Sequence, residues 1–246
     1  SNSDNLGAIA DPTVAGWFAQ SGAPFAIEAV RRTPSDRKGG HFARRRSDGR
    51  IVLRESAQTL PEDQDALADL SRHRFCSTNN LWFNIPAMQA KLDETGGVLG
   101  LSLIRNTKTV DPADPSSVQV IQIESAMGAA IEVFEGATAI GVGRERFLPV
   151  KTTNDLLQLQ SDVYEVGADG LLTRVADPAP LVDLDSRYYK TIGKFSQRFP
   201  TGAPSLKQAS YLSVKCDWTF EDGVVVRGAA SMAVEGGTST VPAGTV

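Results

Sequence analysis

Cysteine and histidine are scarce in this sequence, which has two of each in 246 residues. Cys76 and Cys216 are too few for a disulfide framework, and no C-x-x-C pair or His/Cys cluster indicates a zinc site. This cysteine usage fits a reducing cytosol, so a cytoplasmic location is expected. The G-x-S-x-G nucleophile elbow is also missing, and no covalent intermediate is expected.

Long apolar runs and a strong excess of charge are lacking as well. No stretch of about 18 apolar residues is present, so no membrane-spanning helix is expected, and no signal peptide is recognisable. The formal net charge of -4 at pH 7 gives no electrostatic reason to expect nucleic acid or an anionic membrane as a partner. The length suits one large domain, or one large and one small domain.

Residues 1 to about 176 alternate strand-like and helix-like segments, which is the pattern of an α/β layer architecture. Strands are expected in PFAIEAVRR and in RIVLRESAQ, and SDG at 47–49 is a turn signal. RFCSTNNLWFNIPAMQAKL predicts a strand, a polar loop and a helix, and VQVIQIESAMGAAIEVF predicts a strand and then a helix rich in small residues. ATAIGVGRERFLPV predicts a strand that leads to Lys151.

The proline-rich segment ADPAPLVDLD marks a domain boundary, which divides the chain into residues 1–176 and 177–246. After this boundary, two columns of apolar residues recur every six positions: Leu212, Trp218, Val224 and Ala230, and Val214, Phe220, Val226 and Met232. Gly223 and Gly228 at corner positions favour a hexapeptide solenoid, the start of a parallel β-helix, which needs at least about three stacked turns. A simple β-meander is the alternative.

The segment FLPVKTTNDLL, at 147–157, predicts the end of a strand, a turn at Pro149 and an amphipathic helix. Thr152 and Asp155 have the spacing of a capping box. Lys151 therefore lies just outside a helix N-terminus, whose free amides already favour an anion. A cation there suits a phosphate bound between the two, and the alternative is a solvated lysine.

Three other polar groups are candidates for binding. Asn2, Asp4 and Asn5 of SNSDN follow a predicted strand end, where one carboxylate with phosphate oxygens and waters could hold magnesium, although these residues are also ordinary turn formers. The hydroxyls and amides of STNN at 77–80 could bond sugar hydroxyls or could cap a helix. KGGHF at 38–42 allows a close backbone approach to a ligand, or it is a hairpin entry. Glu55 either faces solvent or accepts a hydrogen bond from a hydroxyl group. The three arginines at 44–46 suit a solvated face near a turn. His41 and His73 have no partners at catalytic spacing and are expected to be structural.

Several segments, in their order and in their amino-acid sequences, resemble one protein family over essentially the whole chain. These segments are SNSDNLGA, KGG, IVLRESAQ, STNNLWFNI, VIQIESAMGAAI and RERFLPVKTTNDLL. They resemble the UDP-glucose pyrophosphorylase family, also called UTP:glucose-1-phosphate uridylyltransferase; RFLPVKTT and TNNLW are the most specific. The resemblance implies an α/β fold of GT-A-like, Rossmann-related type that is truncated at its N-terminal side and is followed by the start of a left-handed parallel β-helix.

The resemblance also implies a reaction in which glucose 1-phosphate and UTP form UDP-glucose and pyrophosphate with Mg²⁺. Lys151 matches the lysine that contacts the phosphates, Asp4 would help hold the metal, and Asn2 would lie at the sugar nucleotide. The positions that line the glucose pocket are matched by Gly40, Glu55, Asn79 and Ser77, the last standing where many relatives have Asn. Cys216 stands where relatives usually have Gly.

The family's glycine-rich nucleotide loop precedes the SNSDN match, so the resemblance implies that the 246-residue polypeptide alone has little or no activity. Two other functions remain open. One is a non-catalytic module that forms homo-oligomers through the β-helix, and the other is a pyrophosphorylase for UDP-N-acetylhexosamine.

Overall fold

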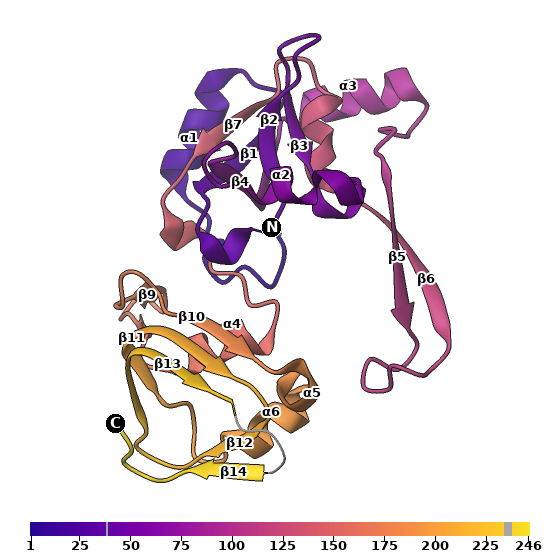
Figure 1. Ribbon diagram of the computed structural model, residues 1–246. Helices are drawn as coiled ribbons and strands as arrows, with labels where there is room; N and C mark the ends of the chain where they lie inside the picture. Colours follow the sequence, from indigo (N-terminus) through magenta and orange to yellow (C-terminus); the bar gives the residue numbers. More distant parts are fainter. Residues whose placement is uncertain (38, 234–237) are drawn as a thin grey trace. The chain divides into compact units, whose positions relative to one another are not determined.

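The computed structural model describes residues 1–37, 39–233 and 238–246, and Lys38 of KGGHF lies outside them. The chain divides into two compact units (Figure 1). Unit 1 comprises Ser1–Ser3 and Ala8–Phe147, and unit 2 comprises Asp4–Gly7 and Leu148–Val246. The predicted boundary between residues 176 and 177 is a different division, and it stays a prediction.

Unit 1 is built around a mixed five-stranded sheet in the order β3-β2-β4-β1-β7. Its strands are β1 (Phe25–Arg31), β2 (His41–Arg44), β3 (Ile51–Arg54), β4 (Phe75–Phe83) and β7 (Thr138–Gly141). A separate two-stranded hairpin consists of β5 (Leu103–Thr109) and β6 (Gln119–Ser125). The helices are α1 (Pro12–Ser21), η1 (Pro34–Asp36), η2 (Ser56–Gln58), η3 (Pro61–Asp63), α2 (Gln64–Ala68), α3 (Ile85–Thr95), η4 (Met127–Glu132) and η5 (Arg144–Arg146).

Strand β1 is an inner strand of this sheet, antiparallel to β4 and parallel to β7. Six of its seven residues are buried, since a central strand covered on both faces needs no polar face. Phe25 and Ile27 pack with Phe134 and Leu53 in the core of the unit. The α/β class expected from the sequence is confirmed, as are the strands in PFAIEAVRR and RIVLRESAQ and the turn that joins β2 to β3.

Three local predictions in unit 1 need correction. The polar loop expected between the strand and the helix of RFCSTNNLWFNIPAMQAKL is wrong, because β4 continues through STNN to Phe83 and absorbs the extra residues as a bulge opposite β1. The helix rich in small residues is a short 3₁₀-helix, η4. The strand expected to lead to Lys151 ends at Gly141, and the helix η5 follows it.

Unit 2 consists largely of parallel strands. β10 (Leu181–Leu184), β11 (Ser205–Val214) and β13 (Val225–Met232) form one sheet, and β12 (Asp217–Phe220) pairs with β14 (Thr238–Val241). The remaining elements are α4 (Thr153–Gln160), β8 (Tyr164–Val166), β9 (Leu172–Arg174), α5 (Ser186–Tyr189) and α6 (Ile192–Arg198). Leu212 pairs with Ala230 and Val214 with Met232, which are the residues three hexads later in the two predicted columns. Because these pairs are parallel, the meander alternative is wrong.

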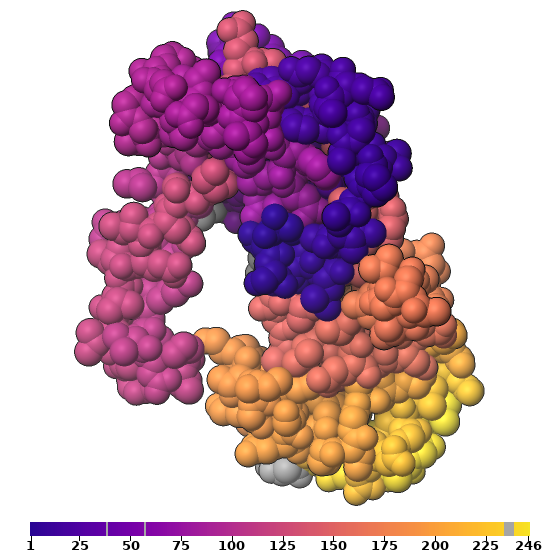
Figure 2. Space-filling model, turned by 180° about the vertical axis from the view of Figure 1, so that it is seen from behind, coloured from indigo at the N-terminus to yellow at the C-terminus, as the bar shows by residue number. Residues whose placement is uncertain are grey.

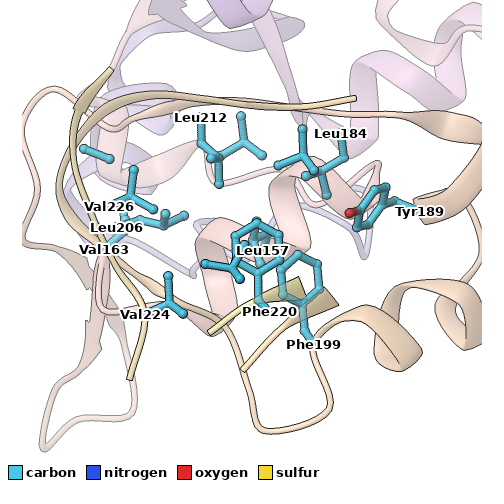
Figure 3. Packing of buried hydrophobic residues seen from close by; sticks show 14 of the residues in the cluster. Leu157, Val163, Leu184, Tyr189, Phe199, Leu206, Leu212, Phe220, Val224 and Val226 are labelled. Carbon is cyan, nitrogen blue, oxygen red and sulfur yellow. The ribbon is translucent and has the colours of Figure 1, made fainter. Parts of the chain in front are cut away.

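The core of unit 2 is formed by residues of the sheet of β10, β11 and β13, of the pair β12 and β14, and of helix α4. Leu157, Leu212, Phe220 and Val226 are buried there, and Figure 3 shows their side chains pointing into the same interior. Buried apolar area contributes about 25 cal/mol per Å², so this cluster is the main stabilising feature of the unit. Among the described residues, no helix is both long and apolar enough to cross a membrane.

Candidate functional site

Asp4 and Lys151 lie on two chain segments that pair with each other in unit 2. Asn5 and Pro149 form an isolated antiparallel bridge, and the amide of Val150 donates to the carbonyl oxygen of Asp4 at 2.9 Å. A backbone hydrogen bond of this kind fixes neighbouring residues relative to one another. The residue predicted to hold the metal and the residue predicted to contact phosphate are therefore held together, although they are far apart in the sequence.

Asn5 joins these two segments through its side chain. It is only 5% exposed, and its Oδ1 atom accepts hydrogen bonds from the amides of Leu148, at 2.9 Å, and Gly7, at 3.2 Å. Buried donors that lose such an acceptor are costly, so this side chain determines the path of the opening segment. The sequence places Asn5 among turn formers, but its partner Leu148 is too distant in the sequence for any local pattern to reveal it.

Helix α4 begins as predicted, with the capping box of Thr152 and Asp155. The carboxylate of Asp155 accepts from the amides of Lys151, at 3.0 Å, and Thr152, at 2.8 Å. These two amides are thereby used, so they are not available to a phosphate. Helix α4 itself begins at Thr153, so the prediction that its first amides and the exposed ammonium group of Lys151 bind one anion stays a prediction.

Near Asp4 the described part of the protein supplies only one carboxylate to a metal ion, so the other ligands would have to come from water and substrate. Asp4 is half-buried, and none of the described residues forms an ion pair with its carboxylate. In the part of the chain that the structure describes, no group of three or more His, Cys, Asp or Glu side chains could hold a metal. One hard carboxylate oxygen suits Mg²⁺, which keeps several waters and takes further ligands from substrate phosphates.

In unit 1, Asn2, Ser77 and Asn79 are brought together by the bulge in β4. The side-chain amide of Asn79 donates to Oδ1 of Asn2 at 2.9 Å, and the backbone amide of Asn79 donates to Oγ of Ser77 at 3.0 Å. Asn79 has a φ of 60°, a left-handed conformation that Asn tolerates better than most residues. The hydroxyl of Thr78 donates to the carbonyl oxygen of Glu28, which replaces the ladder bond lost at the bulge.

Gly40 and Glu55 form a second group in unit 1. A Cβ atom added at Gly40 would lie 2.5 Å from Oε2 of Glu55 and 2.7 Å from its Cδ. The carboxylate of Glu55 therefore lies directly against the Cα atom of Gly40, and only glycine leaves it this room. The Glu55 side chain turns back toward the glycine segment, and its proposed hydrogen bond to a hydroxyl stays a prediction.

Unit 1 also contains a buried ion pair that the sequence did not reveal. Glu28, which is 0% exposed, accepts from Nε and Nη2 of Arg146, at 2.7 Å each, and from Trp82 and Asn80. Burial acts to raise the pKa of Glu28, but these hydrogen bonds outweigh it and hold the pKa below its usual value. Glu28, Trp82 and Arg146 help to line a cavity of ≈ 250 Å³, and none of the predicted sugar-pocket residues lines it.

The two histidines and Cys76 lie away from any nucleophilic arrangement. The rings of His41 and His73 stack with their centroids 3.8 Å apart, and burial lowers the pKa of His41 to about 3. Burial raises the pKa of the Cys76 thiol to about 11. A neutral thiol is a poor nucleophile, so Cys76 is not a candidate for nucleophilic attack.

Unit 1 is thus an α/β sheet with polar residues at a bulge of β4, and in unit 2 backbone pairing holds the segments of Asp4 and Lys151 together. The family model for UTP–glucose-1-phosphate uridylyltransferase matches residues 1–227. The chain belongs to this family, which is the UDP-glucose pyrophosphorylase family.

Known relatives of this family are similar to the chain over its whole length. The UTP–glucose-1-phosphate uridylyltransferase of Hordeum vulgare is 36% identical over 250 residues, covering 100% of this chain and 50% of the relative. The fold is similar to a crystal structure of UDP-glucose phosphorylase from Trypanosoma brucei, with a TM-score of 0.91, 41% identity, and coverage of 100% and 53% of the two chains. A variant UDP-glucose pyrophosphorylase from Leishmania major, crystallised with UDP-glucose, gives a TM-score of 0.87, 40% identity, and coverage of 100% and 54%. The chain thus spans about half the length of the relatives it matches.

Proposed function

We propose that the protein containing this chain forms UDP-glucose and pyrophosphate from UTP and glucose 1-phosphate. The observation that carries the proposal is the pairing that holds Asp4 beside the segment of Lys151. Membership of the family and the similarity to a relative crystallised with UDP-glucose support the same conclusion.

In the proposed reaction, a phosphate oxygen of glucose 1-phosphate attacks the α-phosphorus of UTP, and the bond to the pyrophosphate leaving group breaks. Such a displacement depends on positioning and on neutralising charge, so few protein groups need to react. The ammonium group of Lys151 would offset the charge on the phosphates, and Asp4 would supply a ligand to Mg²⁺. When bound, Mg²⁺ offsets phosphate charge in the same way.

The remaining predicted residues would bind the sugar nucleotide. Asn2 would contact it through the side chain that now bonds Asn79, and Asn79 and Ser77 would present polar groups from the bulge. Glu55, held against Gly40, would accept a hydrogen bond from a sugar hydroxyl. A carboxylate acceptor fixed in this way contributes about 1.5 to 3 kcal/mol per hydrogen bond.

For unit 2, we propose that its parallel strands begin a left-handed β-helix. The support is the pairing of residues three hexads apart in β11 and β13, together with the buried apolar columns. Formation of homo-oligomers through this unit is part of the same proposal.

Replacing Lys151 with Ala in the intact protein tests the proposed reaction. We expect a loss in kcat of about 100-fold or more with unchanged folding, because the phosphates lose a charge partner. Lys207→Ala is the matched control, since Lys207 is also an exposed lysine of unit 2, and it should stay within about twofold of the parent. Full turnover by Lys151→Ala would favour the non-catalytic module instead.

Competition between sugar 1-phosphates decides the substrate. Glucose 1-phosphate should be preferred to N-acetylglucosamine 1-phosphate, and the reverse order would assign the chain to the alternative pyrophosphorylase. The 246-residue polypeptide alone is still predicted to show little pyrophosphate release, and turnover close to that of the intact protein would overturn that prediction.

A further inference from the structure

Strands β1 and β2 follow each other in the sequence but are not neighbours in the sheet of unit 1, because β4 lies between them. The hairpin of β5 and β6 projects from the body of this unit and takes no part in the sheet (Figures 1 and 2). The connection at residues 32–40 therefore has to cross the beginning of β4. It ends with Gly39 and Gly40, the glycine segment against which the carboxylate of Glu55 lies.

The ladders of the sheet do little to hold the glycine segment. β2 is paired along its length with the edge strand β3, but among the described residues it meets β4 only through the pair of His41 and Cys76. The helix η1 in the connection is a single turn of three residues. Two glycines in a row also have great conformational freedom, so ordering them is costly. Other contacts must therefore fix the place of Gly40 if Glu55 is to meet it.

Arg32 supplies such contacts from inside the fold. It is only 6% exposed, and its guanidinium group donates to four backbone carbonyl oxygens. Nη1 donates to Leu67 at 3.0 Å and to His73 at 3.1 Å, on the segment that leads into β4. Nη2 donates to Asp36 at 3.1 Å and to Arg37 at 2.9 Å, in the connection itself. The planar fork of arginine can join two segments in this way, whereas the donors of a lysine all diverge from one atom.

The carbonyl oxygen of Asp36 connects Arg32 to the glycine segment. It accepts from Arg32 and also from the amide of Gly39, at 2.9 Å. From another side, Nη1 and Nη2 of Arg144 donate to the carboxylate of Asp36 at 2.8 and 3.0 Å. A bidentate pair of this kind fixes orientation as well as distance. Two arginines thus hold the turn from which Gly39 and Gly40 continue.

We propose that Arg32 is a positioning residue for the sugar pocket, because it sets the glycine segment where Gly40 leaves room for the Glu55 carboxylate. The inference rests on the proposed function, in which Glu55 accepts a hydrogen bond from a sugar hydroxyl. Arg32 acts through the carbonyl oxygen of Asp36 and the backbone of Gly39 rather than by touching a substrate. Loss of its fork should therefore weaken the binding of glucose 1-phosphate more than that of UTP.

Steady-state kinetics of the intact protein carrying Arg32→Lys test the proposal. Lysine keeps the charge but not the fork, so the KM for glucose 1-phosphate should rise by about 10-fold while the KM for UTP stays within about twofold. Arg50→Lys is the matched control. Arg50 also donates to a backbone carbonyl oxygen, that of Phe134, but it lies at the opposite end of the hairpin of β2 and β3, so neither KM should change.

Hydrogen exchange of the Gly39 amide in the same proteins needs no substrate. Arg32→Lys should accelerate this exchange by about 10-fold or more, and Arg50→Lys should leave it within about twofold of the parent. Unchanged exchange at Gly39, or equal rises in the KM of both substrates, would overturn the role of Arg32 and leave the proposed function standing. An intact parent that forms no UDP-glucose would overturn the proposed function instead.

Arg144→Met keeps the proposal testable where Arg32→Lys does not fold. The side chain of Arg144 is 24% exposed, so its loss endangers folding less, and it holds the same turn through the carboxylate of Asp36. The KM for glucose 1-phosphate and the exchange rate of Gly39 should both rise by about threefold. If neither of these two quantities rises, the proposal is wrong.

Discussion

Replacing Arg146 with Met is expected to destabilise unit 1 by about 3 to 5 kcal/mol. Arg146 donates twice, at 2.7 Å, to the carboxylate of Glu28, which is 0% exposed. Without the guanidinium group, the buried charge keeps only its bonds from Asn80 and Trp82. The cost therefore comes from an uncompensated carboxylate rather than from the small loss of apolar contact.

Replacing Glu28 with Gln should cost less, about 2 kcal/mol. Arg146 then keeps the carboxylate of Asp11 at 3.5 Å and the carbonyl oxygen of Ile9 at 3.2 Å. In the double variant neither charge is left without its partner, so its loss should be smaller than the sum of the two single losses by about 2 to 3 kcal/mol.

Urea unfolding followed by tryptophan fluorescence measures these free energies. Trp218 of unit 2 is first replaced with Phe, so that the signal comes from Trp17 and Trp82 in unit 1. Arg45→Met is the control, because Arg45 pairs with Asp48 and Glu132 at the surface and should contribute under about 1 kcal/mol. A loss below about 1 kcal/mol for Arg146→Met, or additive losses in the double variant, would refute the reasoning.

The same pair gives a dependence on pH. Because the folded pKa of Glu28 is lowered, its contribution to stability is complete above the unfolded pKa and is lost as the pH falls through the folded pKa. Glu28→Gln removes this contribution, so its unfolding free energy should fall less on acidification than that of the parent. Parallel curves for the two proteins in the acidic range would contradict it.

Three further predictions follow from individual contacts. His41→Phe keeps an aromatic ring but removes the titratable imidazole, whose pKa falls from 6.5 to about 3 on folding. Between pH 7 and pH 5 the parent should lose up to about 2 kcal/mol more of its free energy of unfolding than the variant. Equal losses in thermal or urea unfolding would refute this. Gly40→Ala should raise the KM for glucose 1-phosphate in the intact protein by about 10-fold, because the added Cβ displaces the Glu55 carboxylate. Gly141→Ala is the control, since an added Cβ there meets nothing within 4 Å, and it should change KM little. Equal effects of the two substitutions on KM would contradict the prediction. Asn5→Ala should destabilise unit 2 by about 1 to 3 kcal/mol in hydrogen exchange of its core amides, and unchanged protection would argue against the role assigned to Asn5.

Features that depend on near neighbours in the sequence could be predicted. The capping box of Thr152 and Asp155 follows from a spacing of three residues, and the turn at 47–49 follows from its glycine, which has a φ of 71°. The hexad columns also contain residues of β11 and β13 that lie side by side, Leu212 with Ala230 and Val214 with Met232.

Features that depend on contacts between residues far apart in the sequence could not be predicted. The bulge in β4 looks like a loop in the sequence, because only the pairing with β1 shows that Ser77 and Leu81 continue one strand. The bond between Asn2 and Asn79 and the contact between Gly40 and Glu55 likewise depend on the tertiary fold. The resemblance identified these residues one by one, and the structure adds how they touch.

Cys216 shows how a residue other than glycine can be held in a left-handed backbone conformation. Its φ of 68° is the left-handed conformation that glycine adopts freely, and a side chain there costs about 1 to 2 kcal/mol. Its amide donates to the carboxylate of Asp185 at 3.1 Å, an acceptor whose pKa the neighbouring Arg187 holds well below its usual value. A charged acceptor strengthens such a bond to about 1.5 to 3 kcal/mol, which is enough to hold the corner between β11 and β12 without a glycine.

Hydrogen bonds also fix the backbone of the segments around Asp4 and Lys151. A single lysine near an anion gains little unless its position is fixed, since ordering a long side chain costs up to about 2 kcal/mol of rotamer freedom alone. The backbone of Lys151 is fixed from one side by Asp155 and from the other by the pairing of Val150 with Asp4, which Asn5 holds in place. The backbone on both sides of the ammonium group is therefore already ordered, so in the proposed reaction only the side chain of Lys151 would have to be ordered when a phosphate binds.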